Sequence, residues 1–307
     1  MAPAHSDYGA LRRNAASTGG KVAAAAADEP ACSRWRRQLG ENRMPTRTIN
    51  GAELYFEGSG SGPPVFFIHG MCGNANVWDD QRERLSDMFR CVAYDRRGHT
   101  RSSWGDVDPG SVEMHADDAA ALIEALVLAP CVLVASSGGA RIGVDVVRRY
   151  PALIERAVLS EPPIAALAPA EAGEFMATVK PALEEAIQSH GPRAAVDAFF
   201  ELVCPGLWKR LDDSRREPYR ANHRALFADL QMPPYQVTAD DLDSVHVPCL
   251  ILRGDESHPF LRSVAGRIAD AIPKAQLVEL KDCGHVTYAE RPSEFAAAVR
   301  QFVSSTT

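Results

Sequence analysis

Short apolar runs alternate with longer segments of helical spacing over most of this sequence, from about residue 46 to residue 305. Each apolar run has the length of a buried strand, and each longer segment repeats apolar residues three or four positions apart, as an amphipathic helix does. Alternating strands and helices are typical of βαβ units, so we predict an α/β fold with a mostly parallel central sheet and helices on both faces. The predicted strands are residues 65–68, 91–94, 131–135, 157–160, 249–252 and 276–280, and the predicted helices are residues 76–89, 112–128, 139–150, 261–271 and 293–303.

Two segments depart from this alternation. Residues 47–56 are predicted to form a hairpin, because Asn50-Gly51 is a dipeptide favoured in two-residue type I′ turns. Residues 164–244 have helical spacing and lack a β-rich run, which predicts a helical lid inserted into the fold. The α/β core is then expected to consist of residues 44–163 and 245–307.

Residues 1–43 differ in composition from the rest of the chain. They are rich in Ala, Ser, Gly and Arg and contain few large apolar side chains. Such a segment buries too little apolar surface to offset its ordering entropy. We interpret it as a disordered leader, or as the product of an upstream start codon. An arginine-rich transit peptide is the alternative.

Composition and charge narrow the classes of function. The net charge of −7 argues against nucleic acid and anionic membranes as partners, because both attract basic surfaces. No run approaches the roughly 20 apolar residues of a membrane span. The seven cysteines are odd in number and scattered, without a C-x-x-C pair. We therefore expect a cytoplasmic protein with reduced thiols, no metal and no cofactor, and we leave the oligomeric state open.

One strand-to-helix junction has the sequence of a nucleophile elbow. A buried apolar strand runs into Ser136 and Ser137, which two glycines and a helical segment follow. The nucleophile of such an elbow sits in a strained turn, so the residues two positions before and after it must be small. Ala135 and Gly139 meet this requirement around Ser137, whereas Val134 would be too bulky if Ser136 were the nucleophile. We therefore predict that Ser137 is the nucleophile.

Three further segments lie in register with this junction, and together the four resemble the α/β-hydrolase family over roughly residues 46–305. Residues 66–71 (FFIHGM) resemble the strand and the His-Gly oxyanion segment of that family. Residues 94–102 resemble its D-x-R-G-x-G-x-S loop, with Thr100 in place of the second glycine. Residues 283–285 (CGH) resemble the segment of the catalytic histidine. The resemblance implies an enzyme of the serine hydrolase type.

Chemistry and the resemblance together assign further groups at the site. A serine hydroxyl is a poor nucleophile and needs a base, and histidine suits because its pKa lies near working pH. His285 follows the last predicted strand, where the resemblance places the base. The resemblance also implies that the backbone N–H groups of Met71 and Gly138 stabilise the developing oxyanion. We interpret His69 and His99 as structural residues of their loops.

The triad acid is where the sequence departs from the common pattern of the family. The acid usually lies in a G-x-x-D turn after the next-to-last strand, but Ser257 holds that position here and carries no charge. Asp255, in the same turn, could reach the histidine after a local backbone shift. Glu161 directly follows a buried strand, where a carboxylate is costly unless it is paired, and the two prolines after it fix its direction. We favour Glu161 and keep Asp255 as the alternative.

Large apolar side chains in the predicted lid indicate a pocket for a small molecule with an apolar part. These side chains are Phe175, Met176, Phe199, Phe200, Leu207, Trp208, Tyr219, Phe227, Met232 and Tyr235. The favoured function is hydrolysis of an ester, thioester or lactone through an acyl-enzyme. The alternatives are hydrolytic cleavage of a C–C bond, lyase or cofactor-free oxidative chemistry on the same fold, and a ligand-binding receptor without turnover.

Overall fold

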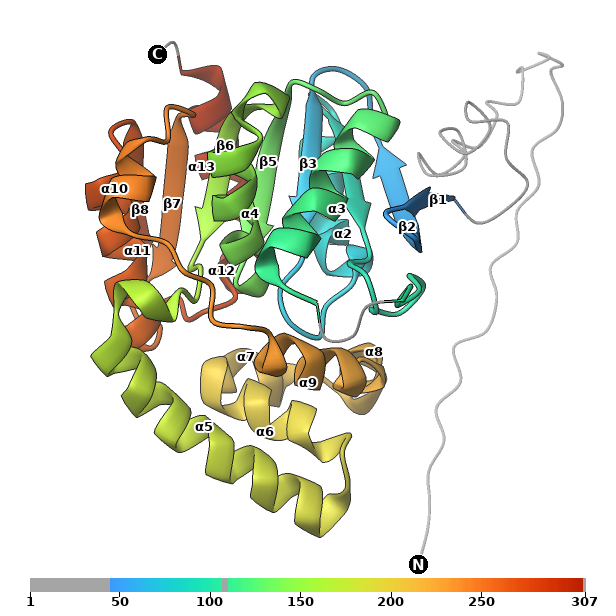
Figure 1. Ribbon diagram of the computed structural model, residues 1–307, viewed down its shortest axis with the longest axis vertical. Coiled ribbons are helices and arrows are strands. Elements are labelled where there is room, and N and C mark those ends of the chain that lie inside the picture. The colour runs from blue at the N-terminus through green and yellow to red at the C-terminus, as the bar shows by residue number, and fades with distance from the viewer. Residues whose placement is uncertain (1–44, 107–109, 306–307) are drawn as a thin grey trace, which may run out of the picture.

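A computed structural model describes residues 45–106 and 110–305 of the chain. Its centre is an eight-stranded sheet with the strand order β1-β2-β4-β3-β5-β6-β7-β8 (Figure 1). Strands β3 to β8 pair in parallel, and the β1–β2 and β2–β4 pairs are antiparallel. The fold class predicted from the sequence is therefore confirmed. The strands are β1 (Thr46–Ile49), β2 (Ala52–Ser59), β3 (Pro64–Ile68), β4 (Arg90–Tyr94), β5 (Cys131–Ser136), β6 (Ile154–Ser160), β7 (Cys249–Gly254) and β8 (Ala275–Leu280).

The apolar runs of the sequence form the central strands because both of their faces are covered. Every residue of β5 is buried, and so are four of the five residues of β3. Continuous burial of this kind is typical of parallel strands between two layers of helices. At the edge of the sheet, Asn50 (φ 46°) and Gly51 (φ 77°) are both left-handed, as a type I′ turn requires, and they join β1 to β2 in the predicted hairpin.

Helices cover both faces of the sheet. Helices α3 and α4 pack together on one face, and α2 and α13 pack together on the other (Figure 1). Two predicted helices are shorter than expected: residues 86–89 turn the chain into β4, and Val127 with a φ of 52° follows the end of α3. The core helices are η1 (Ala75–Trp78), α2 (Asp79–Leu85), α3 (Val112–Ala125), α4 (Gly138–Arg149), η2 (Pro151–Leu153), α11 (Pro259–Ala271), α12 (Thr287–Glu290) and α13 (Pro292–Ser304).

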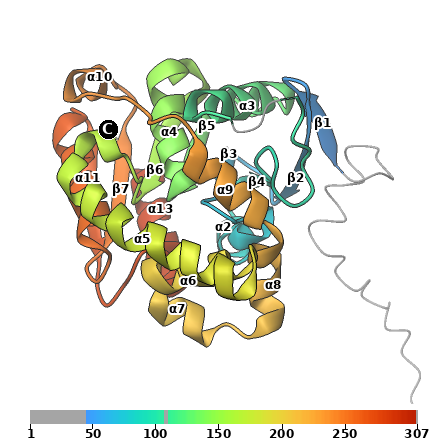
Figure 2. The same cartoon turned by 60° about the horizontal axis from the view of Figure 1, so that its bottom comes forward.

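The chain between β6 and β7 forms helices and no strand over residues 164–244, and we call this segment the helical insert. Helices α5 to α9 lie across the carboxyl ends of the parallel strands (Figures 1 and 2). Helix α10 instead packs against α11 of the core. The helices of the insert are η3 (Ala165–Leu167), α5 (Pro169–His190), α6 (Ala194–Val203), α7 (Pro205–Arg210), α8 (Asp213–Ala221), α9 (His223–Gln231) and α10 (Ala239–Asp243).

Three expectations from the sequence concern the chain as a whole. The interpretation of residues 1–43 falls on a segment outside the described residues. Within the described ranges, no helix is long and apolar enough to span a bilayer. The cysteines at positions 72, 91, 131, 204, 249 and 283 are all buried and unpaired.

Candidate active site

Ser137 occupies the sharp turn between β5 and α4. Its φ of 55° and ψ of −127° lie outside the regions that residues with a Cβ normally adopt, so the backbone is strained at this point. The turn also brings α4 very close to the end of β3. A Cβ on Gly139 would lie 2.5 Å from the carbonyl oxygens of both Ile68 and His69. Glycine is therefore required at that position, as the spacing around Ser137 indicated.

A continuous chain of hydrogen bonds joins Ser137, His285 and Glu161. The Oγ of Ser137 lies 2.9 Å from Nε2 of His285. On the other side of the ring, Nδ1 of His285 lies 2.6 Å from Oε2 of Glu161. The histidine is 5% exposed and the glutamate is completely buried. These residues come from the ends of β5, β8 and β6, and the parallel sheet gathers them at one edge.

Glu161 is held by three hydrogen-bond donors. Its Oε1 accepts from the backbone N–H of Gly254 at 2.8 Å, and its Oε2 accepts from the hydroxyl of Ser257 at 2.6 Å as well as from His285. A buried carboxylate is tolerated when its lone pairs are satisfied in this way. The residue itself has a φ of 47°, which turns its side chain back toward the sheet edge.

Asp255 lies close by but contacts other groups. It accepts a hydrogen bond from the backbone N–H of Cys283 at 3.2 Å and lies 3.6 Å from the ammonium of Lys281. Ser257, at the position where the family usually has its acid, instead supports Glu161 through its hydroxyl. Of the two carboxylates considered from the sequence, the structure places Glu161 against His285.

The two backbone groups expected to face an oxyanion also lie together. A Cβ built on Gly138 would lie 3.5 Å from the backbone nitrogen of Met71. The loop that carries Met71 is fixed by His69, whose Nε2 accepts from the backbone N–H of Arg96 and whose Nδ1 therefore donates to the carbonyl of Gly70 at 2.8 Å. Burial keeps the pKa of His69 well below 6.5, so the ring stays neutral. Its place beside the loop agrees with a structural role.

A buried ion pair connects the loop after β4 to the helical insert. The guanidinium of Arg96 donates to both carboxylate oxygens of Asp229 on α9, at 3.2 and 2.5 Å. Burial alone would raise the pKa of Asp229, but the charge of Arg96 and the nearby His99 hold it well below its usual value. His99, which also bonds Arg96, has its pKa lowered to about 4 by burial and by that arginine. The loop after β4 is therefore joined to the insert by charge.

Asn222, at the junction of α8 and α9, makes a second connection that the sequence did not indicate. Its amide donates to the carbonyls of Cys72 and Gly73 at 3.0 and 2.9 Å, next to the oxyanion loop. Its Oδ1 accepts from the backbone N–H of Thr100 at 2.8 Å. Thr100 has a φ of 41°, so the position where the family prefers glycine keeps the left-handed turn, which Asn222 supports.

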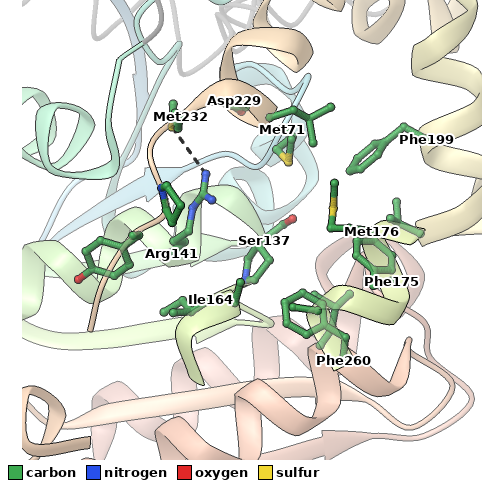
Figure 3. Close-up of a pocket in the computed structure, with 18 of the residues that line it drawn as sticks. Met71, Ser137, Arg141, Ile164, Phe175, Met176, Phe199, Asp229, Met232 and Phe260 are labelled. Atoms are coloured by element: carbon green, nitrogen blue, oxygen red, sulfur yellow. Dashed lines mark hydrogen bonds between the residues drawn. The ribbon is translucent and has the colours of Figure 1, made fainter. Parts of the chain in front are cut away.

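A cavity of about 310 Å³ opens between the sheet edge and the insert, with Ser137 and His285 in its wall (Figure 3). Of the large apolar side chains in residues 164–244 that the sequence singles out, Phe175, Met176, Phe199, Met232 and Tyr235 line this cavity. Others pack among themselves inside the insert: the rings of Phe200 and Trp208 stack at 4.5 Å, and Tyr219 meets both edge-on. The remaining lining residues include Met71, Arg141, Ile164, Lys180, Val203, Asp229, Leu230, Phe260 and Leu261.

No cluster of three or more His, Cys, Asp or Glu side chains suited to a metal ion occurs within residues 45–106 and 110–305. Among the described residues, the polar groups that line the cavity are the hydroxyls of Ser137 and Tyr235, the imidazole of His285, two cationic side chains and the carboxylate of Asp229, which Arg96 already engages. This arrangement can deliver a serine nucleophile, accept its proton and hold an apolar substrate.

Comparison with known proteins identifies the family of the chain. The sequence matches the alpha/beta hydrolase family over residues 65–298, so the chain belongs to that family. An uncharacterised hydrolase of Bacillus subtilis, YraK, is 35% identical over 118 residues, which cover 38% of this chain and 44% of that protein. The non-heme chloroperoxidase CPO-A1 of Kitasatospora aureofaciens is 28% identical over 78% of this chain and 90% of its own length.

A solved structure has the same fold over nearly the whole described chain. Est816, described as an N-acyl homoserine lactone degrading enzyme, superposes with a TM-score of 0.69 at 26% identity. The match covers 84% of this chain and 100% of Est816.

Proposed function

We propose that this protein is a serine hydrolase that cleaves an ester, thioester or lactone through an acyl-enzyme. The observation that carries the proposal is the unbroken chain from the Ser137 hydroxyl through His285 to the buried Glu161, with contacts of 2.9 and 2.6 Å. Both distances are those of hydrogen bonds between a nucleophile, its base and the group that orients the base.

In this mechanism His285 takes the proton of Ser137 as the hydroxyl attacks the carbonyl carbon of the substrate. Glu161 holds the ring with Nδ1 protonated, so that Nε2 is the acceptor, and it stabilises the imidazolium that forms. The N–H groups of Met71 and Gly138 bind the negative oxygen. His285 then protonates the leaving group, and a water molecule that it activates releases the acid from Ser137.

The cavity supports a substrate with an apolar part. Phenylalanine and methionine side chains make up much of its wall, and its size suits a small molecule rather than a polymer. The description of Est816 as a lactone-degrading enzyme favours a lactone among the three bond types. We further propose that the helical insert is a lid, because several of its side chains line the cavity that also contains Ser137 and His285.

A pair of neighbouring serines provides the test. Ser137→Ala is expected to lower kcat/KM for 4-nitrophenyl butyrate by at least about 10⁴, because no nucleophile remains for an acyl-enzyme. Ser136→Ala removes the adjacent, buried hydroxyl and is the matched control, expected to keep activity within about threefold. Mass spectrometry of the wild type during turnover should show the butyryl adduct on Ser137. Activity of Ser137→Ala close to that of the wild type would refute the proposal.

The name of CPO-A1, a non-heme chloroperoxidase, supports a second candidate, halide oxidation by a peroxide without a haem. Bromination of a 1,3-diketone in the presence of bromide and peroxide measures this activity directly. If bromination by the wild type exceeds its ester hydrolysis, the second candidate replaces the first.

A further inference from the structure

Arg141 is a charged residue of the cavity that the proposed reaction leaves without a role. It lies on α4 four residues after Ser137, and its backbone N–H donates to the carbonyl of Ser137 at 3.0 Å. Residues four apart lie on the same face of a helix, with their Cα atoms roughly 6 Å apart along the axis. The side chain of Arg141 extends from α4 toward Met232 and lines the same cavity as Ser137 (Figure 3).

The guanidinium of Arg141 has no carboxylate partner among the described residues. Its Nε is fully buried and lacks any hydrogen-bond partner, and Nη2 reaches only the sulfur of Met232 at 3.7 Å, a weak acceptor. The fully buried arginines Arg96 and Arg97 are paired, Arg96 with Asp229 and Arg97 with Asp118 at 2.8 Å. Arg141 is only partly buried, but its buried Nε has no partner, and leaving such a group unpaired is costly. A ligand that accepts hydrogen bonds from the guanidinium would remove this cost.

The local charges leave one positive charge uncompensated. Asp229 is the only carboxylate among the described residues that line the cavity, and both of its oxygens are engaged by Arg96. The neighbouring His99 is neutral at ordinary pH because burial lowers its pKa to about 4. Lys180, an exposed residue of α5, adds a second cation to the cavity wall. The cavity wall therefore combines positive charge with apolar side chains, which suits a ligand with a negatively charged group on an apolar body.

We propose that the substrate of this enzyme carries a carboxylate that Arg141 binds. A short carbon chain separates this carboxylate from the scissile carbonyl. The planar fork of a guanidinium matches the two oxygens of a carboxylate and binds them with charge-assisted hydrogen bonds. Such a contact orients the substrate over Ser137, one helical turn away. This proposal rests on the proposed hydrolase function and specifies its substrate class.

Matched pairs of esters test the proposal by kcat/KM. Mono-4-nitrophenyl glutarate is paired with neutral 4-nitrophenyl valerate, and 3-carboxyphenyl butyrate with neutral phenyl butyrate, so that the carboxylate lies on the acyl side in one pair and the alcohol side in the other. Arg141→Met is expected to lower kcat/KM for at least one anionic ester by about 10- to 150-fold, while its neutral partner stays within about threefold. Equal effects on the anionic and neutral members of both pairs would overturn the proposal.

Two further variants distinguish a direct contact between Arg141 and the carboxylate from the general attraction of an anion to a positively charged cavity. Lys180→Met removes a cation from the same cavity wall and is expected to cost the anionic ester less than about fivefold, because an exposed charge is screened. Arg141→Lys keeps the charge without the planar fork and is expected to recover only part of the loss. Losses of the same size for Lys180→Met and Arg141→Met would refute a specific role of Arg141.

Binding without turnover distinguishes failure of this proposal from failure of the hydrolase function. Calorimetry with glutarate on the Ser137→Ala protein should show one site, and adding Arg141→Met should abolish it. If the wild type hydrolyses none of the four esters, the proposed function fails, yet glutarate binding still tests Arg141. Absence of glutarate binding, or binding of inorganic phosphate in its place, would contradict a carboxylate site.

Discussion

Replacing Glu161 with glutamine keeps the shape of the side chain but replaces one carboxylate oxygen with an NH2 group. The groups around this side chain all donate hydrogen bonds, so the NH2 group finds no acceptor. The carboxylate accepts from Gly254 on one oxygen, and from Ser257 and His285 on the other. If the amide NH2 faces Gly254, two donors meet. If it faces His285, Nδ1 must become an acceptor, and Nε2 then carries the proton and can no longer take one from Ser137.

The expected magnitude follows from the bonds that are lost. One or two charge-assisted hydrogen bonds at about 1.5–3 kcal/mol each give about 1.5–6 kcal/mol. This corresponds to a fall in kcat of about 10–10⁴, since each 1.36 kcal/mol is tenfold in rate. Asp255→Asn is the matched control: Asp255 accepts from Cys283 and faces Lys281, so kcat should stay within about threefold.

Initial rates with 4-nitrophenyl butyrate measure both variants, and circular dichroism establishes that each has folded. A Glu161→Gln enzyme within tenfold of the wild type would refute the reasoning. A larger loss for Asp255→Asn than for Glu161→Gln would move the acid to the turn after β7.

Two further predictions concern stability. Gly139→Ala should leave little soluble protein, because its Cβ would meet two backbone oxygens at 2.5 Å. Gly173→Ala, within α5 and with nothing within 4 Å of the added Cβ, should instead raise the free energy of unfolding by about 0.5–1 kcal/mol in urea titrations. A soluble, native-like Gly139→Ala protein would contradict the close approach. Burial keeps the pKa values of His69 and His115 well below 6.5 and lowers that of His99 to about 4, so below pH 6.5 the unfolded chain binds more protons than the folded one. The free energy of unfolding should therefore fall as the pH drops from 6.5 toward 4, by up to about 1.4 kcal/mol per pH unit for each ring, and a flat profile would contradict neutral buried rings.

Local sequence patterns were sufficient for the fold because each element carried its own signal. The apolar run of β5 predicts a strand covered on both faces, and Asn50-Gly51 predicts its turn without reference to the rest of the chain. Element ends were less predictable. Helix α3 ends at Ala125 because Val127 takes a left-handed conformation, which a β-branched residue rarely adopts and which nothing in its neighbourhood in the sequence indicates.

Contacts between distant residues could not be derived from the sequence. The choice between Glu161 and Asp255 depends on which carboxylate contacts His285. Glu161 is more than a hundred residues from His285 in the sequence, so only the fold determines this contact. Asn222 and Asp229 sit in a helical region without a motif, so their bonds to the core had no local signal. The spacing of Arg141, one turn after Ser137 on a predicted helix, was a signal that could have been used.

The position of Glu161 limits how the helical insert could be replaced to change the substrate specificity. The residue follows the end of β6, and Pro162 and Pro163 connect it to the helical insert, so the carboxylate that bonds His285 lies next to the point where the insert leaves the core. A graft that replaces the helical insert must therefore keep residues 161–163 intact. The turn after β7 supplies Glu161 with the N–H of Gly254 and the hydroxyl of Ser257, so a redesign of that turn must keep both groups.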